Sequence, residues 1–327
     1  MSNTLVDLSI VIPLFNEEES IPALLHELCG VCSLVGRSYE IVLINDGSVD
    51  STPQLLEVAA GKDQRIKVLT LSRNFGQQAA FNAGIDVAAG KMVVMMDGDL
   101  QYPPSMIPEF IKHADEGYDI VIGERIKNKQ NNFFRELVGR VFYKVLNKIT
   151  DLEFRNSNDF GLYKRSVISV IKKMPEKERF LRGMVQWVGF KKKFLPYVVE
   201  DRKFGVPKYN FRKLAALVMS GVTSFSALPL RLALWAGFLV LIFSIGFSGF
   251  VAWDHYTNPN PIIAGWATLV ILLLFTSSIQ LIVLGVVGEY LYKMFHEVKG
   301  RPLYIVSSTQ NIDKEQVEPS AYGIHHG

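Results

Sequence analysis

The chain has 327 residues, and 35 Lys and Arg residues against 32 Asp and Glu residues give it a formal charge of +3. Hydrophobic residues make up 49% of the sequence and the mean hydropathy is +0.18, although soluble domains of this size normally average below zero. These values exclude a disordered or highly charged chain. The slight basic excess does not indicate a nucleic-acid-binding protein, so no nucleic-acid partner is expected.

The apolar excess lies in two runs near the C-terminus. Leu232 to Trp253 and Ile262 to Val287 contain no Asp, Glu, Lys, Arg or His. Each run is longer than the roughly 20 residues that cross a hydrocarbon core of about 30 Å. They predict two membrane-spanning helices within the segment 230–290. A buried pair of core helices in a soluble protein is the alternative interpretation.

Four short apolar runs precede these spans and are typical of buried parallel strands. Asn16 is expected to cap the first helix between them, with Glu17, Glu18 and Glu19 in its first turn. Strands that alternate with helices at this spacing predict right-handed crossovers and a mostly parallel α/β sheet, with the ligand at the carboxyl ends of the strands. The expected strands are 7–13, 39–45, 66–71 and 91–96, and the later helices are 50–60 and 76–89.

The sequence after these strands is less regular. A fifth strand is expected at 119–123, an amphipathic helix at 134–149 and a late strand at 194–199. A helix expected at 211–225 carries its charges at its start and is otherwise apolar, which suits a helix in the membrane interface. The expected organisation is an α/β domain at 1–209, an interfacial helix at 210–229, the two spans at 230–290, and a tail at 291–327 that is polar and mobile after Ser307.

Basic residues predict the orientation of the two spans. Arg231 precedes the first span, whereas Lys293, Lys299 and Arg301 follow the second, and the connection 254–261 contains no Lys or Arg. The positive-inside bias therefore places both ends of the pair in the cytoplasm. The N-terminus lacks the basic-then-apolar order of a signal peptide, so the head is also expected to be cytoplasmic.

The only two cysteines, Cys29 and Cys32, have the C-x-x-C spacing of redox and zinc sites. No second pair and no His partner follows at metal-ligand spacing. Both share one face of a predicted helix with Leu25 and Leu28. We therefore expect two buried core thiols. The low count also excludes a secreted fold built on disulfides.

Acidic side chains follow several of the predicted strands. Asp97 and Asp99 flank a glycine directly after the fourth strand, and two such carboxylates can hold a divalent cation that keeps positions open for diphosphate oxygens. A solvated turn is the alternative for this motif alone. Asp46 and Asp50 follow the second strand, so polar groups converge on one edge of the sheet, which favours a nucleotide ligand.

Several motifs together resemble those of a known enzyme class. SIVIPLFNEEES (9–20), INDGSVDST (44–52), LSRNFGQQAA (71–80) and MDGDLQYPP (96–104) stand in the order seen in inverting glycosyltransferases with the GT-A fold. The segment Asn158-Asp159-Phe160, the basic turn that ends at Lys208 and the two spans resemble polyprenyl-phosphate glycosyltransferases, such as bactoprenol glucosyltransferases and dolichyl-phosphate mannose synthases. The resemblance extends to about Tyr304. It departs from the family at Asn158, where relatives have Gly.

The resemblance implies roles for individual residues. Asp159 and Asp99 are the implied catalytic residues, and Mg²⁺ or Mn²⁺ is implied as the cofactor. For the basic residues, solvated or membrane-surface cations are the alternative, above all for Arg135. The implied nucleotide-sugar site comprises Pro13, Asn16, Glu17, Asp46, Asp50, Asp97 and Gly98; the metal site comprises Asp97, Asp99 and Gln101; the acceptor-phosphate site comprises Arg125, Arg135, Arg202 and Lys208.

The resemblance also implies an activity. The expected reaction is inverting transfer of a hexose, best matched by glucose from UDP-glucose, to undecaprenyl phosphate at the cytoplasmic face of a bacterial inner membrane, for modification of a cell-surface glycan. A homo-oligomer is implied as well. A phosphomonoester with a second pKa of about 6 is already a nucleophile at neutral pH, so Asp159 is expected either to act as a base or to orient the acceptor.

Other activities stay open at this point. GDP-mannose or a UDP-linked amino sugar could replace UDP-glucose as donor. A processive polysaccharide synthase would need more spans and a Q-x-x-R-W motif, which is absent because Gln186 and Trp187 are adjacent. A flippase or binding scaffold for lipid-linked sugars would need a pathway, and the spans carry no charge that marks one.

Overall fold

The computed structural model describes residues 6–126, 157–176, 181–198, 228–257 and 265–312. The chain divides into two compact units. The first comprises Met1–Tyr209 together with Arg301–Gly327, and the second comprises Asn210–Gly300. The helices expected at 134–149 and 211–225 lie outside the described residues, as does the basic turn at 201–208.

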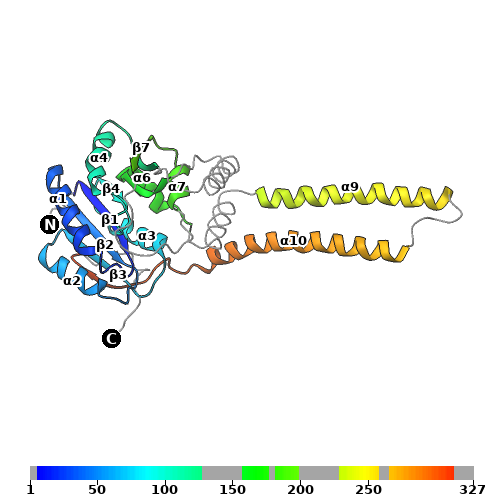
Figure 1. The fold of residues 1–327 in the computed structure, drawn as a ribbon, viewed down its shortest axis with the longest axis horizontal. Coiled ribbons are helices and arrows are strands. Elements are labelled where there is room, and N and C mark those ends of the chain that lie inside the picture. The colour runs from blue at the N-terminus through cyan, green and yellow to red at the C-terminus, as the bar shows by residue number, and fades with distance from the viewer. Residues whose placement is uncertain (1–5, 127–156, 177–180, 199–227, 258–264, 313–327) are drawn as a thin grey trace. The chain divides into compact units, whose positions relative to one another are not determined.

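The first unit is built on one eight-stranded sheet, with the strand order β7-β5-β6-β4-β1-β2-β3-β8 (Figure 1). β1, β2, β3 and β4 run parallel to one another, as their continuous apolar sequences predict. The strands are β1 (Leu8–Leu14), β2 (Tyr39–Asn45), β3 (Ile66–Leu71), β4 (Met92–Met95), β5 (Ile120–Ile126), β6 (Ser157–Lys164), β7 (Lys192–Val198) and β8 (Val306–Gln310).

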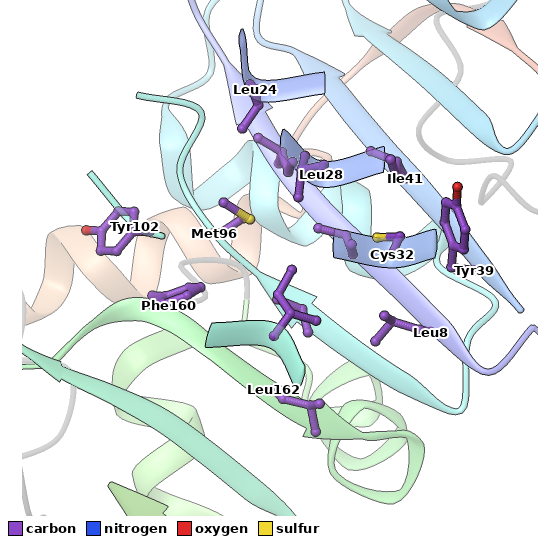
Figure 2. Close-up of a cluster of buried hydrophobic side chains, with 14 of the residues drawn as sticks. Leu8, Leu24, Leu28, Cys32, Tyr39, Ile41, Met96, Tyr102, Phe160 and Leu162 are labelled. Carbon is purple, nitrogen blue, oxygen red and sulfur yellow. The ribbon is translucent and has the colours of Figure 1, made fainter. Parts of the chain in front are cut away.

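Helices cover both faces of this sheet. The large buried cluster in Figure 2 joins side chains of α1, α2 and α4 to the residues of β1 and β2 that point to the same face, including Leu8 and Ile41. α3 packs on the other face, where a side chain at Gly84 would collide with Val11 and Ile44. The helices are α1 (Ile21–Val35), α2 (Thr52–Lys62), α3 (Gln77–Val87), α4 (Ile107–Asp115), α6 (Arg165–Lys173) and α7 (Leu181–Trp187), with the short 3₁₀ turn η1 (Pro104–Met106).

The two cysteines lie on α1, as predicted. Cys32 is buried in this cluster, whereas Cys29 is half-buried and packs against it. Both thiols are free, and burial raises the pKa of each, to about 12 for Cys32. These features confirm a buried core thiol at Cys32, whereas Cys29 is less buried than expected and lies at the edge of the cluster.

The half of the sheet beyond β4 is mixed rather than parallel. β6 runs antiparallel to both β4 and β5, and β5 pairs with β7 in parallel. The apolar runs predicted β5 and β7, but they gave no sign of β6, which is interrupted by polar residues and glycine. β6 matters for function because its antiparallel register brings a distant part of the chain to the carboxyl end of β4.

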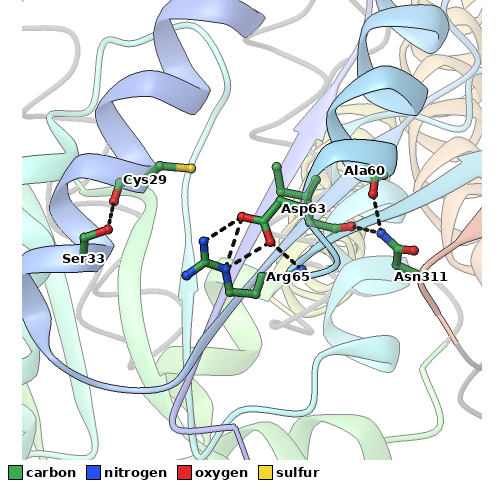
Figure 3. A network of polar contacts seen from close by, with 7 residues as sticks. Cys29, Ser33, Ala60, Asp63, Arg65 and Asn311 are labelled. Atoms are coloured by element: carbon green, nitrogen blue, oxygen red, sulfur yellow. Dashed lines mark hydrogen bonds and ion pairs between the residues drawn. The ribbon is translucent and has the colours of Figure 1, made fainter.

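The last strand corrects the expectation of a mobile tail after Ser307. β8 pairs antiparallel with β3, and Thr309 lies opposite Leu69. Beyond the strand, the side-chain amide of Asn311 donates to the carbonyl oxygens of Ala60 and Ile66 at 2.8 and 2.9 Å; Figure 3 shows the bond to Ala60. The segment around residues 304–312 is therefore a bound edge of the sheet.

The second unit contains two long helices, α9 (Leu228–Thr257) and α10 (Gly265–Lys299). Both are long and apolar enough to cross a membrane, over Leu230–Phe250 and Phe275–Lys299, by length and composition alone. Large apolar side chains are exposed along both, for example Leu234 at 73% and Leu281 at 69%. Such surfaces are rare on soluble proteins outside interaction sites.

Candidate active site

A pocket of about 370 Å³ opens at the carboxyl ends of β1, β2 and β4, where ligands bind in open α/β sheets. Six residues of the implied nucleotide-sugar and metal sites line it together, so the structure brings most of the expected set to one place. They are Pro13, Glu17, Asp46, Asp97, Gly98 and Asp99. The pocket is completed by Leu14, Phe15, Asn74, Gly76 and Gln77.

Asp46 fixes the loop on the β3 side of the pocket. Its side chain is buried, and its two oxygens accept hydrogen bonds from the backbone N–H groups of Phe75 and Gly76 at 2.8 and 2.9 Å. Burial raises the pKa of this carboxyl, while the two backbone donors act in the opposite direction. Gly47 next to it has φ 68°, and a side chain there would collide with the backbone of Arg73. The sequence does not reveal this backbone contact.

Asn16 is not the cap of the first helix, which corrects the prediction from the sequence. α1 begins at Ile21, its N-cap is Ser20, and its first turn contains no acidic residue. Asn16 has φ 54° instead, and its side-chain oxygen accepts a hydrogen bond from the N–H of Val49 at 2.9 Å. Because Asn tolerates the left-handed region, the chain turns at Asn16 and delays the helix.

Asp50 and Glu17 join the same two loops. Asp50 accepts hydrogen bonds from the N–H groups of Glu18 and Thr52 at 3.2 and 3.0 Å, and the N–H of Glu17 donates to the Thr52 hydroxyl at 3.0 Å. Neither Asn16 nor Asp50 lines the pocket. Their described contacts tie the segment after β1 to the segment after β2, and so fix the wall that carries Glu17 and Asp46.

Asp97 stands on the opposite side of the pocket, directly after β4. The side-chain amide of Gln77, at the start of α3, donates to its Oδ1 at 2.5 Å. Burial raises the pKa of Asp97 to about 7, with the nearby carboxylates of Asp159 and Asp99 acting in the same direction. Three acidic groups are thus close enough to repel one another, and positive charge brought into the pocket would relieve that repulsion.

The donor set around Asp97 suits a hard divalent cation that is bound jointly with a ligand. Mg²⁺ is usually held by one or two carboxylates together with water and substrate phosphates. Asp97 and Asp99 provide two such carboxylates, and Asp99 also accepts the N–H of Gln101 at 3.2 Å, which shapes the turn. Among the described residues, no group of three or more His, Cys, Asp and Glu side chains could hold a metal ion. The residues therefore fit an open site that a diphosphate completes.

Asp159 comes to this edge through the antiparallel pairing of β6 with β4. Met95, the last residue of β4, lies opposite Gly161, two residues after Asp159, and Asp159 is close enough for its charge to raise the pKa of Asp97. Asp159 is 7% exposed, and its oxygens accept hydrogen bonds from Arg182 and Gln78. The sequence singled out neither of these partners, because nothing in their spacing indicates that residues 78, 159 and 182 meet.

Of the four basic residues implied for the acceptor phosphate, the structure describes one. Arg125 lies on β5 near Tyr197. Burial raises the pKa of Tyr197 to about 12; Asp97 and Asp99 act in the same direction and Arg125 in the opposite one. Arg125 lies opposite Tyr197 in the pairing of β5 with β7, and the charges of Arg125, Asp97 and Asp99 are all close enough to act on that tyrosine. Arg135, Arg202 and Lys208 lie outside the described residues.

Comparison with known proteins identifies the family. The model of glycosyl transferase family 2 matches residues 9–171. The glycosyltransferase sll0501 of Synechocystis sp. is 38% identical over 94% of this chain and 97% of its own. The glycosyltransferase YkcC of Bacillus subtilis is 38% identical over 95% of this chain and 97% of its own.

A relative with a named acceptor extends this result. The SfII prophage-derived bactoprenol glucosyl transferase of Shigella flexneri is 36% identical over 92% of this chain and 98% of its own. Its alignment over nearly the full length confirms the resemblance to polyprenyl-phosphate glycosyltransferases that the motifs indicated. The α/β sheet with a pair of carboxylates after β4 is the expected GT-A arrangement. The chain therefore belongs to glycosyl transferase family 2 and is a glycosyltransferase.

Proposed function

We propose that this protein transfers glucose from UDP-glucose to undecaprenyl phosphate at the cytoplasmic face of a bacterial inner membrane. The observation that carries the proposal is one pocket lined by Asp97 and Asp99 together with Glu17 and Asp46, in a chain that aligns with bactoprenol glucosyl transferases over nine tenths of its length. The pocket combines a fixed wall for a nucleoside with carboxylates for the metal that accompanies a diphosphate.

In this proposal one side of the pocket binds the nucleoside and the other binds the metal ion. Pro13, Glu17 and Asp46 frame the nucleoside, and Asn16 and Asp50 keep that wall in place. Asp97, Asp99 and Gln101 would hold Mg²⁺ or Mn²⁺. The bound cation supplies charge stabilisation for the departing diphosphate. Gln77 keeps the Asp97 carboxylate directed toward the pocket, because its amide occupies one of the two oxygens.

The proposed reaction needs no proton transfer from the acceptor. A phosphomonoester oxygen attacks C1 of the sugar, the bond between C1 and the diphosphate oxygen breaks, and UDP leaves with that electron pair, so the configuration at C1 inverts. The phosphate oxygen is already anionic at neutral pH. Bringing two anions together is the harder task, and we assign it to Arg125, Arg135, Arg202 and Lys208 together with the cation.

The two apolar helices explain how such a head reaches its acceptor. A polyprenyl phosphate stays in the bilayer, so an enzyme that uses it must act at the membrane surface. We propose that α9 and α10 cross the bilayer as a pair, with Arg231 in the first turn of α9, Lys299 at the end of α10 and Arg301 just after it, all on the cytoplasmic side. Two crossings agree with the pairing of β8 with β3, because the chain returns to the first unit after α10.

The test is a transfer assay with the purified full-length protein. Radiolabelled UDP-glucose, GDP-mannose and UDP-N-acetylglucosamine are each incubated with undecaprenyl phosphate and Mg²⁺ or Mn²⁺, and label in an organic-extractable lipid is counted. We expect label from UDP-glucose alone, and none in the presence of EDTA. Label from another donor would replace the assignment of the sugar. UDP binding without transfer from any donor would contradict the proposed acceptor.

A further inference from the structure

The carboxylate of Asp159 accepts three side-chain hydrogen bonds, which restrict its orientation more than water would. Arg182 donates to it twice, from Nη2 to Oδ2 at 3.0 Å and from Nε to Oδ1 at 3.3 Å. Gln78 donates from Nε2 to Oδ2 at 3.1 Å. Asp159 is 7% exposed and the Arg182 side chain 21%, so this pair is largely removed from water. Both carboxylate oxygens are thus fixed in place by donors from other elements.

Gln78 is itself locked in one orientation. Its side-chain oxygen accepts the backbone N–H of Leu181 at 3.3 Å, at the start of α7. A side-chain amide has one acceptor end and one donor end. Because its oxygen is turned to Leu181, its NH₂ group must face Asp159. The residue therefore joins three elements that are far apart in sequence, namely α3, β6 and α7.

The arrangement extends directly to the pocket. Gln77 and Gln78 are consecutive at the start of α3, and Gln77 donates to Asp97 while Gln78 donates to Asp159. Neighbouring amides on one helix turn thus hold two carboxylates that are close enough to repel each other. Arg182 adds the positive charge on the Asp159 side. Gln77, Gln78 and Arg182 therefore keep these two like charges at a fixed separation.

We propose that Arg182 and Gln78 are positioning residues that hold the Asp159 carboxylate in the orientation required for sugar transfer. This inference rests on the proposed function and adds to it that Asp159, the catalytic residue implied by the resemblance, contacts the bound sugar or acceptor. A carboxylate oxygen retains a free lone-pair direction after it accepts one hydrogen bond, so the fixed group can still accept a bond from a substrate hydroxyl. Preorganised groups of this kind act on the transition state and thus on turnover.

The inference differs from a purely structural role in what it predicts. A structural ion pair would lower the stability of the protein when either partner is removed, and its loss would appear as a lower melting temperature with kcat per folded molecule unchanged. A positioning residue acts through Asp159 alone. Its removal should therefore lower kcat in the wild-type background and have little further effect once Asp159 is neutral, since residues that act as a unit are strongly non-additive.

The experiment is a double-mutant cycle on the full-length protein, with UDP-glucose and undecaprenyl phosphate as substrates. Asp159→Asn is expected to lower kcat by at least about 100-fold, and Arg182→Ala by about 10- to 100-fold. In the Asp159→Asn background, Arg182→Ala should change kcat by less than about threefold. The affinity for UDP, measured by calorimetry, should stay within about threefold of wild type in each variant, because the nucleoside wall lies elsewhere.

Two further variants test whether the loss of kcat comes from lost positioning rather than from misfolding. Arg182→Lys keeps the charge but cannot donate from two nitrogens to both oxygens, so an intermediate loss of kcat is expected. Gln78→Ala should give a smaller loss of the same kind, again only when Asp159 is present. Arg37→Ala is the matched control, because it removes an Arg–Asp pair with Asp115 at the opposite end of the sheet and should leave kcat unchanged.

The outcomes separate this inference from the proposed function. Equal losses of kcat on Arg182→Ala in both backgrounds, or full activity of Arg182→Ala when Asp159→Asn is inactive, would overturn the positioning role alone. Full activity of Asp159→Asn would overturn the catalytic assignment of Asp159 and the positioning role with it. The absence of transfer by the wild-type protein, with UDP still bound, would contradict the proposed function itself.

Discussion

Acidic residues have different roles on the two sides of the pocket. On the side of β1 and β2, Asp46 and Asp50 accept hydrogen bonds from backbone N–H groups, and these bonds fix loops. On the side of β4 and β6, Asp97 and Asp159 accept bonds from side chains, and the charge of Asp159 raises the pKa of Asp97. The first group completes the fold, whereas the second leaves negative charge concentrated where a ligand binds.

This contrast has an energetic basis. A buried N–H group that loses its acceptor bears the full cost of desolvation, so removing an acid from the first group should weaken the protein. Like charges that are close together raise the free energy of the folded state, so neutralising Asp97 should spare the fold or strengthen it, whereas neutralising Asp159 would leave the partly buried Arg182 without its ion pair. The same substitution type should therefore harm stability on one side of the pocket and activity on the other.

The largest effect is expected at Asp99. Asp99→Ala removes one of the two carboxylates assigned to the metal, and transfer should fall by about 1,000-fold or more, because electrostatic stabilisation of the leaving diphosphate is lost. The melting temperature without metal should change little. Radiolabel transfer and thermal melting are measured on the same preparation, with Mn²⁺ and UDP added in a second melt. Stabilisation of the variant by Mn²⁺ and UDP to the wild-type extent would show that the metal site is misplaced.

A smaller effect, of the opposite type, is expected at Asp46. Asp46→Ala leaves the N–H groups of Phe75 and Gly76 without their acceptor, which should destabilise the protein by about 2–4 kcal/mol. The loop that lines the pocket then loosens, so UDP affinity should fall as well. Asp46→Asn is the control, because its single oxygen can retain one of the two bonds. An unchanged melting temperature for Asp46→Ala would contradict the loop-fixing role.

The smallest effect is expected at Asp97, and it depends on pH. The folded-state pKa is raised to about 7, so wild-type stability is lost as pH rises from the ordinary Asp range through that value. Asp97→Asn avoids this loss. In EDTA the variant should therefore melt at a higher temperature than wild type at pH 8, by a few degrees, and this difference should shrink as the pH is lowered toward 4. Equal melting temperatures at pH 8 would mean that the acidic cluster carries no repulsion.

The parallel half of the sheet could be predicted from sequence because each of its strands is a continuous apolar run. β2 and β3 were placed at their observed bounds, and the acids that follow β2 and β4 marked the ligand edge. The start of α1 was placed too early, because Asn16 is a good cap residue by type but takes a left-handed conformation here. Residue type alone does not reveal which backbone conformation the tertiary contacts select.

The antiparallel half and the partners of Asp159 could not be predicted in this way. β6 and β8 contain polar residues and have no simple alternation, so neither has a strong period. Gln78, Asp159 and Arg182 meet only because β6 inserts beside β4 and α7 packs behind it. One signal was available, namely the paired amides in the segment SRNFGQQ, but a sequence does not say which acids they face.

The edge strand β8 has a consequence for how the protein is made. Ser307 bonds to Thr70 across a separation of 237 residues, and both apolar helices are encoded between them. During synthesis β3 therefore remains an open edge until the ribosome has passed α10, and open edges invite pairing with other chains. A chain that stops just after Lys299 would contain both helices and the whole pocket, yet its sheet would still lack the strand that closes it.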